Sequence, residues 1–139
     1  MFENTGFGRQ LDILHRSMDT GLLRQNVIAH NISNANTPNF KRSVVNFESR
    51  LSHALESENR RPRFREALTD EDHNAFTKRV DYRDVRPRRV LDFTTTAKNN
   101  GNNVDIEVES MNLLNNQLAY QMMTRSVADS FQRINLVLQ

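Results

Sequence analysis

Three side chains near the N-terminus have types and spacing that could bind a metal ion. Asp12, His15 and Asp19 stand at positions i, i+3 and i+7, which share one face of a helix. Together they could offer an imidazole and two carboxylates as ligands. The commoner arrangement of such a trio is a solvent-exposed histidine paired with carboxylates. We expect that arrangement and predict no metal site.

Arginines gather in the middle of the chain, where they could bind nucleic acid. They are Arg60, Arg61, Arg63, Arg65, Arg86, Arg88 and Arg89, with Phe64 among the first four. Guanidinium groups bind phosphates, and an aromatic ring can stack on a base. Nearby acids would cancel much of the positive field: Glu66, Asp70, Glu71, Asp72, Asp81 and Asp84. A nucleic-acid-binding protein is therefore kept as an alternative, and a solvated, salt-bridged excursion is preferred.

The sequence offers no group of residues typical of an enzyme. It has no Gly-rich phosphate loop, no H-E-x-x-H motif and no cysteine. The lack of cysteine excludes disulfides, thiol nucleophiles and thiolate zinc sites. The 139 residues allow one domain, or one domain with an excursion, and the net charge of +2 indicates no particular partner. We predict that the chain is not an enzyme and has no catalytic residues and no cofactor.

Two segments with helical periodicity would position any site. Apolar residues recur every three, four or seven positions from Gln10 to Ile32, and again from Val104 to Leu138. Asp105 is the expected N-cap of the second helix. Gly21 would let another helix approach closely. The fold predicted is mainly α, with long N- and C-terminal helices pairing as an antiparallel coiled coil.

The segment between these helices has a different composition. Residues 60–89 hold ten basic and six acidic residues and two of the three prolines, too polar to form a core alone. We expect a polar middle excursion that is disordered or contains a short β-hairpin, formed from Val80–Val85 and Arg89–Thr96. The predicted organisation is a disordered N-terminus at 1–9, a helical coiled-coil domain at 10–40 and 104–139, and a variable middle segment at 41–103.

Charged residues are scarce on both predicted helices. From Ser110 to Gln139 only Arg125, Asp129 and Arg133 are charged, and Asn, Gln, Ser and Thr fill the other polar positions. Uncharged polar side chains can be buried if neighbours satisfy their hydrogen bonds, whereas Lys and Glu are depleted in interface cores. This pattern favours helices enclosed by other subunits, and an ordinary helical bundle is the alternative. The residues expected to make subunit contacts are Leu11, Leu14, Met18, Leu22, Ile28, Ile32, Leu113, Leu118, Tyr120, Val127, Phe131 and Ile134.

Asparagines cluster where the first helix should end, in the run HNISNANTPNFKR from His30 to Arg42. Asn tolerates left-handed backbone best after Gly, so Asn34 or Asn36 is the predicted C-cap. Pro38 and Asn39 then fit the central positions of a turn, with positive φ at Asn39. The corner is expected to comprise Asn31, Asn34, Asn36, Thr37, Pro38, Asn39 and Phe40, with the Phe40 ring anchoring it on the helices.

The run NISNANTPNFK, Asn31 to Lys41, resembles the N-terminal signature of bacterial flagellar rod, hook and hook-associated axial proteins. The usual form of that signature is close to N-I-A-N-A-N-T-P-G-Y-K, from which the chain departs at Ser33, Asn39 and Phe40. A chain this short lacks room for the outer domains of hook and distal-rod proteins, which leaves the small proximal-rod proteins. The segment GNNVDIEVESMNLLNNQLAYQMMTRSVADSFQRINLVL, Gly101 to Leu138, is also similar to the C-terminal part of a proximal-rod protein.

The resemblance implies a structural subunit of the basal-body rod. Such a subunit would be exported unfolded through the flagellar type III apparatus and polymerised, for motility, into the rod within the periplasm. Its implied partners are other flagellar rod subunits and the MS-ring/export-gate junction protein, with self-association, no nucleic acid and no membrane insertion. The terminal helices would pack as a coiled coil lining the axial tube. A non-flagellar coiled-coil adaptor is the remaining alternative.

Overall fold

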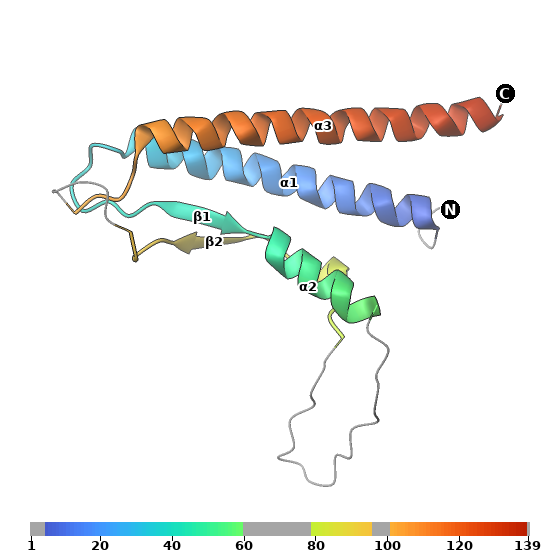
Figure 1. Cartoon of the computed structure of the whole chain (residues 1–139), viewed down its shortest axis with the longest axis horizontal. Helices are drawn as coiled ribbons and strands as arrows, with labels where there is room; N and C mark the ends of the chain where they lie inside the picture. The colour runs from blue at the N-terminus through green and yellow to red at the C-terminus, as the bar shows by residue number, and fades with distance from the viewer. Residues whose placement is uncertain (1–4, 60–78, 96–100, 139) are drawn as a thin grey trace, which may run out of the picture. The chain divides into compact units, whose positions relative to one another are not determined.

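The computed structural model describes residues 5–59, 79–95 and 101–138 of the chain (Figure 1). The elements in chain order are α1 (Gly6–Ser33), β1 (Ser43–Asn46), α2 (Glu48–Asn59), the 3₁₀ helix η1 (Tyr82–Asp84), β2 (Arg88–Leu91) and α3 (Ile106–Leu138). The prediction of a mainly helical fold is confirmed. The chain divides into two units, residues 1–45 with 89–139 and residues 46–88. Each unit is described by itself.

Helix α1 begins earlier than its apolar periodicity predicts. It starts at Gly6 instead of Gln10, because the Thr5 side chain accepts a hydrogen bond from Gly8 N at 3.1 Å and caps the first turn. The Phe7 ring packs edge-on against Phe131, with the ring centroids 6.0 Å apart. Residues 6–9 are therefore helical, where the sequence suggested disorder. Residues 1–4 lie outside the described residues.

Helices α1 and α3 run antiparallel and lie side by side (Figure 1). Phe7, near the start of α1, contacts Phe131 in the C-terminal part of α3. Asn31, near the end of α1, forms a hydrogen bond with Glu109 in the first turn of α3. The two helices therefore run in opposite directions. Buried or half-buried residues spaced by three, four or seven positions recur along α3, as the seam of a helix pair requires. We call this face the seam, and its residues are Glu109, Leu113, Asn116, Tyr120, Met123, Val127 and Ile134.

The start of α3 carries the predicted cap. Asp105 Oδ1 accepts a hydrogen bond from Glu107 N at 2.9 Å, and Asp105 O accepts from Glu109 N at 2.9 Å. The helix begins at Ile106, two residues after the predicted start. Glu107 and Glu109 lie in its first turn, where the helix dipole favours negative charge. No helix in the described ranges is both long enough and apolar enough to cross a membrane.

The sheet has two antiparallel strands, β1 and β2, and its pairing differs from the predicted hairpin. The strand predicted at Arg89–Thr96 is present only in part, as β2, which ends at Leu91. Its partner is β1, and Asp92 N donates to Arg42 O at 2.9 Å just beyond the strands. The other predicted strand, Val80–Val85, contains η1 instead. The Asp81 carboxylate accepts from Arg83 N at 2.9 Å and caps that turn, which bends the backbone out of the extended form.

The unit formed by residues 46–88 has a small core of its own. It includes α2, which the sequence did not predict because its apolar residues are few. The buried apolar residues are Phe47, Leu51, Ala54, Tyr82 and Val85. Ser57 Oγ accepts from Val80 N at 3.1 Å and ties α2 to the segment before η1. The arginine cluster predicted around Phe64, with the acids from Glu66 to Asp72, lies outside the described residues.

Candidate functional site

Helix α1 ends at the predicted corner with Asn34 as its C-cap, but Asn34 has a φ of −103° and not the left-handed backbone that the prediction assumed. Asn34, one of the two expected caps, donates from its backbone N to Asn31 O at 3.2 Å and from its side-chain Nδ2 to His30 O at 2.8 Å. Asn39 has φ of 59°, the left-handed conformation expected at that position of the turn. The Phe40 ring lies on α1, with its centroid 5.5 Å from that of His30. The corner is therefore held by its own side chains against the last turn of the helix.

Asn31 joins three segments through one buried amide. Its Nδ2 donates to Ser43 O at 2.8 Å and to Glu109 Oε2 at 3.0 Å, and its Oδ1 accepts from Ser43 N at 3.0 Å. The side chain thus pairs with β1 as a neighbouring strand would, while it also reaches α3. The Asn31 side chain is completely buried, and both of its amide hydrogens and its amide oxygen have hydrogen-bond partners. An uncharged side chain was needed here because a charged one would lack a matching partner on β1.

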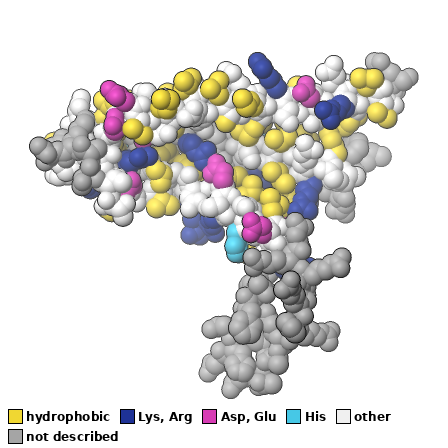
Figure 2. All heavy atoms as spheres, viewed as in Figure 1, with side chains coloured by type: hydrophobic (Ala, Val, Ile, Leu, Met, Phe, Trp, Pro, Cys, Tyr) yellow, Lys and Arg dark blue, Asp and Glu magenta, His cyan; other side chains and the backbone are white. Residues whose placement is uncertain are grey.

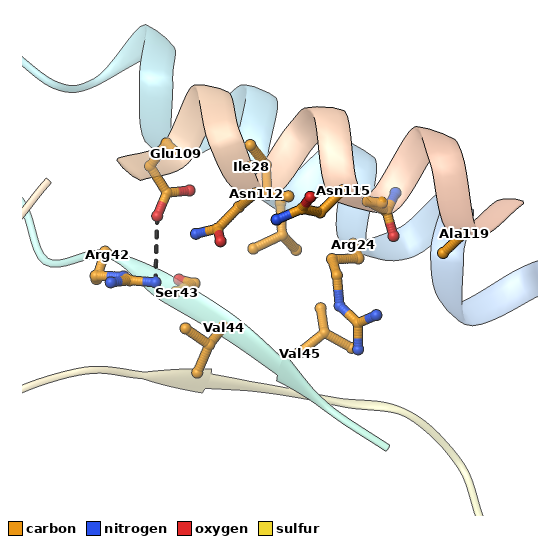
Figure 3. A pocket seen from close by; sticks show the side chains of 12 residues that line it. Arg24, Ile28, Arg42, Ser43, Val44, Val45, Glu109, Asn112, Asn115 and Ala119 are labelled. Atoms are coloured by element: carbon orange, nitrogen blue, oxygen red, sulfur yellow. Dashed lines mark ion pairs between the residues drawn. The ribbon is translucent and has the colours of Figure 1, made fainter. Parts of the chain in front are cut away.

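Glu109 is a buried carboxylate balanced by one arginine. The residue is 1% exposed, and its Oε1 lies 3.2 Å from Arg42 Nη2 (Figure 3). Oε1 makes this ion pair without a well-aligned hydrogen bond, and the buried Arg42 Nε also has no hydrogen-bond partner. The ion pair neutralises the charge of Glu109 but leaves hydrogen-bonding capacity of both side chains unused. Such a pair contributes more to fixing the position of its neighbours than to net stability.

A second pair of amides, which the sequence analysis missed, holds the segment before α3. Asn102 Nδ2 donates to Ala35 O at 2.7 Å, and Asn102 Oδ1 accepts from Val104 N at 2.9 Å. Asn103 Oδ1 accepts from Arg42 N at 2.6 Å. Both residues are buried. Both residues belong to the run NNGNN, which is typical of a turn. The same run also supplies the side-chain amides that form hydrogen bonds with the corner.

Two glycines mark close approaches within this unit. Gly101 has φ of 75°, and a Cβ there would lie 3.0 Å from Asn39 Oδ1. Lys41 Nζ donates to Gly101 O at 2.9 Å. On the helices, the buried Asn116 of α3 donates from Nδ2 to Gly21 O at 2.9 Å. A Cβ added at Gly21 would lie 3.8 Å from Asn116 Oδ1, an ordinary contact distance.

The residues predicted to make subunit contacts divide into two groups. Most lie between α1 and α3: Leu11, Leu14, Met18, Ile28, Ile32, Leu113, Tyr120, Val127 and Ile134 are half-buried or buried. Leu22, Leu118 and Phe131 are about half exposed, at 46 to 48%, although the Phe131 ring also packs against Phe7 of α1. The helical periodicity alone did not separate these groups, because both repeat every three or four residues.

An apolar stripe runs along the side of α3 that points away from the seam. Leu118 stands about 200° around the helix axis from Asn116. The members of this stripe, which we call the outer face, are Met111, Leu114, Leu118 and Met122, and each is at least 46% exposed. Figure 2 shows hydrophobic side chains at intervals along this helix. A helix that is apolar on two opposite sides normally has neighbours on both.

The candidate metal ligands and three of the seven arginines considered for nucleic-acid binding lie within the described residues. His15 Nδ1 lies 3.5 Å from Asp19, while Asp12 pairs with Arg16 Nε at 3.1 Å. Among the described residues, no group of three or more His, Cys, Asp or Glu side chains is placed to hold a metal ion. Of the arginines considered for nucleic-acid binding, Arg86, Arg88 and Arg89 are described and exposed.

One carboxyl group has a perturbed pKa. The Thr95 hydroxyl donates to Asp92 Oδ2 at 2.8 Å, and Thr94 N donates to Oδ1 at 3.0 Å. These hydrogen bonds, that of Thr95 first, stabilise the carboxylate and hold the pKa of Asp92 below its usual 3.8, against a smaller opposing effect of desolvation. The backbone of the same residue accepts from Asn103 Nδ2 at 2.7 Å. Asp92 therefore terminates β2 and connects it to the segment before α3.

The sequence is similar to a known protein family and to individual members of it. The sequence profile of the family described as "Flagella basal body rod protein" matches residues 17–41, which cover the second half of α1 and the corner. The chain is 45% identical to the flagellar basal body rod protein FlgB of Borreliella burgdorferi, over 96% of this chain and 98% of the relative. It is 29% identical to FlgB of Bacillus subtilis, over 95% of each. The chain therefore belongs to the FlgB family of flagellar basal-body rod proteins, whose members are structural and not enzymatic.

Proposed function

We propose that this rod protein polymerises through its two terminal helices. The observation that carries the proposal is the outer face of α3, which leaves Met111, Leu114, Leu118 and Met122 largely exposed on the side opposite α1. Covering the exposed parts of four such side chains would contribute roughly 3–6 kcal/mol per contact. Repeated along a filament, a contribution of this size supports stable assembly.

The corner gives the contact surfaces a fixed geometry. Asn31, Asn102 and Asn103 bond the backbone of neighbouring segments, so α1, β1 and the start of α3 are held in one arrangement before any neighbour binds. Fixing surfaces in advance lowers the entropy lost on association. We assign the fixed geometry of the subunit to this corner and the association energy to the helices.

The cellular role follows from the same proposal. The chain would be exported through the flagellar type III apparatus and assembled in the periplasm, for motility. Its partners would be other rod subunits and the junction protein between the MS ring and the export gate. The sequence contains no cysteine, so no disulfide would have to be broken for the chain to pass unfolded through a narrow export channel.

The test is a pair of adjacent substitutions on α3. Leu118→Asp places a charge on the outer face, and Gln117→Asp places the same charge on an exposed position that is already polar. In a strain lacking its own copy, Leu118→Asp should abolish swimming and leave no rods in electron micrographs. Gln117→Asp should restore both. Normal swimming and intact rods with Leu118→Asp would refute assembly through this face.

A further inference from the structure

The outer face of α3 has opposite charges at its two ends. Glu107 precedes its four apolar side chains by one helical turn, and Arg125 follows them by one turn. All six residues fall within about 80° of each other around the helix axis. Both charged residues are exposed, and no charged residue stands between Ser110 and Thr124. The outer face is therefore an uncharged stripe with an acid at one end and a base at the other.

This stripe points away from the rest of its unit. In Figure 1, α1 and β1 lie on the same side of α3, and Asn116 on that side donates to Gly21 O of α1. The residues beside the stripe are also exposed, and those with polar side chains are uncharged: Ser110, Asn115 and Gln121. Amides and hydroxyls lose less on burial than charged groups do. The stripe therefore suits a partner that is apolar at its centre and charged at its ends.

We propose that a second copy of the chain covers the outer face, with the two α3 helices antiparallel and related by a two-fold axis. Glu107 and Arg125 are equally far in sequence from position 116, so reversing the stripe about that position places Glu107 of one copy opposite Arg125 of the other. The same reversal places Leu114 opposite Leu118 of the second copy. Met111 then lies next to Met122 of the second copy, and the two-fold axis repeats every contact.

Charge selects this direction over the parallel one. In a parallel pair, Glu107 would lie beside Glu107 of the second copy, and Arg125 beside Arg125, so both ends would repel. In the antiparallel pair both ends attract. The stripe from Glu107 to Arg125 is about 27 Å long, and a contact of this length along a single helix is small for a protein interface. The dimer should therefore be reversible and separate at low micromolar concentration.

The antiparallel dimer goes beyond the proposed function, because it does not extend a polymer. A two-fold contact uses the same surface on both copies and closes, whereas a polymer that extends in one direction joins two different surfaces. A copy in such a dimer has its outer face covered. The dimer is therefore a state of copies that have not yet assembled, and it must dissociate before the outer face can meet a neighbour in the rod.

Charge reversal tests the direction of the pair. The purified full chain is followed by sedimentation velocity from about 1 to about 200 μM, where we expect an equilibrium between monomer and dimer. Glu107→Arg alone, or Arg125→Glu alone, makes both end contacts like-charged and should weaken the dimer roughly tenfold. The double variant with both substitutions should recover the affinity. A mixture of the two single variants should form heterodimers, because one then has a base at each end and the other an acid.

Cysteine cross-linking tests the register without background, because the chain has no cysteine of its own. The antiparallel pair brings Met111→Cys of one copy close to Met122→Cys of another, whereas two copies of either variant alone hold their thiols about 15–18 Å apart along the axis. We expect a disulfide-linked dimer from the oxidised mixture and not from either variant alone. The matched control replaces Met111→Cys with Asn112→Cys, which turns the thiol by about 100° around α3 and should give no cross-linked dimer.

The outcomes separate this inference from the proposed function. Cross-linking within each single variant but not in the mixture would show a parallel pair and overturn the proposal. A chain that stays monomeric over the whole concentration range, or single charge variants that pair as well as the unmodified chain, would overturn it too. None of these results would change the requirement for Leu118 in rods. Conversely, intact rods with Leu118→Asp would refute the proposed function and leave a dimer measured in solution standing.

Discussion

Asn31 and Ser43 are paired as two strand residues would be, although Asn31 belongs to a helix. The Asn31 amide donates to Ser43 O at 2.8 Å and accepts from Ser43 N at 3.0 Å. The second hydrogen of the same amide group goes to Glu109 at 3.0 Å. One side chain therefore satisfies both polar backbone groups of Ser43 and fixes the start of β1 against both long helices.

Replacing Asn31 should destabilise the fold far more than replacing a neighbouring asparagine of the same motif. Asn31→Ala leaves two buried backbone groups of Ser43 without partners, which should cost roughly 2–4 kcal/mol. The control is Asn36→Ala, at an exposed position, where we expect a change within about 0.5 kcal/mol. Urea denaturation followed by circular dichroism measures both free energies of unfolding. Equal midpoints for the two variants would contradict the role given to the Asn31 amide.

The Arg42–Glu109 pair should show strong coupling in a double-mutant cycle. Arg42→Met leaves the buried Glu109 carboxylate without its counterion and should cost about 3–5 kcal/mol of the free energy of unfolding. Glu109→Gln keeps an acceptor for Asn31 and removes the charge, so we expect a smaller loss. The double variant should lose less than the two single losses added, with a coupling energy of about 1–3 kcal/mol. Additive losses would show that the ion pair does not act as a unit.

Two glycines should respond to alanine in opposite directions. At Gly21 an added Cβ would lie 3.5 Å from Tyr120 Cδ2, an ordinary contact distance. Gly21→Ala should therefore gain up to about 1 kcal/mol from helix propensity. At Gly101 the φ of 75° and the 3.0 Å approach to Asn39 both oppose a side chain, so Gly101→Ala should lose about 1–2 kcal/mol. Thermal midpoints that move the same way would contradict the packing at one of the two sites.

Local rules in the sequence were enough to predict both long helices and the ends that meet at the corner. Apolar periodicity located α1 and α3, the Asp105 cap is present, and Asn34 and Asn39 adopt the cap and the positive φ expected of them. All of these depend on residues within a few positions of each other. Helix α1 starts four residues before its apolar periodicity, because the Thr5 cap lies outside that pattern.

The features that could not be predicted depend on contacts between distant segments. The predicted strand overlaps β2 but extends beyond its end at Leu91, and the partner strand β1 is more than 40 residues away in sequence. The buried roles of Asn102 and Asn116 require backbone groups at Ala35 and Gly21, which no local pattern reveals. Periodicity also cannot distinguish a residue that faces the helix partner from one that faces a neighbouring copy.

Stability in acid should depend on Asp92. Hydrogen bonds from Thr95 and Thr94 lower the pKa of its carboxyl group in the folded protein below 3.8. Because the folded state binds the proton more weakly than the unfolded state, the stabilisation is fully present above that usual value and is lost as pH falls through the lowered pKa. Asp92→Asn removes this dependence while keeping the side-chain shape. Urea midpoints measured from about pH 5 to about pH 2 should fall more steeply for the unmodified chain, and parallel slopes would contradict the shift.

Charges introduced at Val127 and Leu118 should separate folding of the subunit from its assembly. Val127 is half-buried on the seam against α1, so Val127→Asp should weaken the helix pair by about 2–4 kcal/mol. Leu118 is 46% exposed on the outer face, and Leu118→Asp should change the free energy of unfolding by less than about 1 kcal/mol. Both variants should fail to form rods, but only the Leu118 variant should keep the far-ultraviolet circular dichroism and urea midpoint of the unmodified chain. Equal destabilisation of the two would mean that Leu118 packs within the subunit, and the outer face would then lose its assignment as an assembly surface.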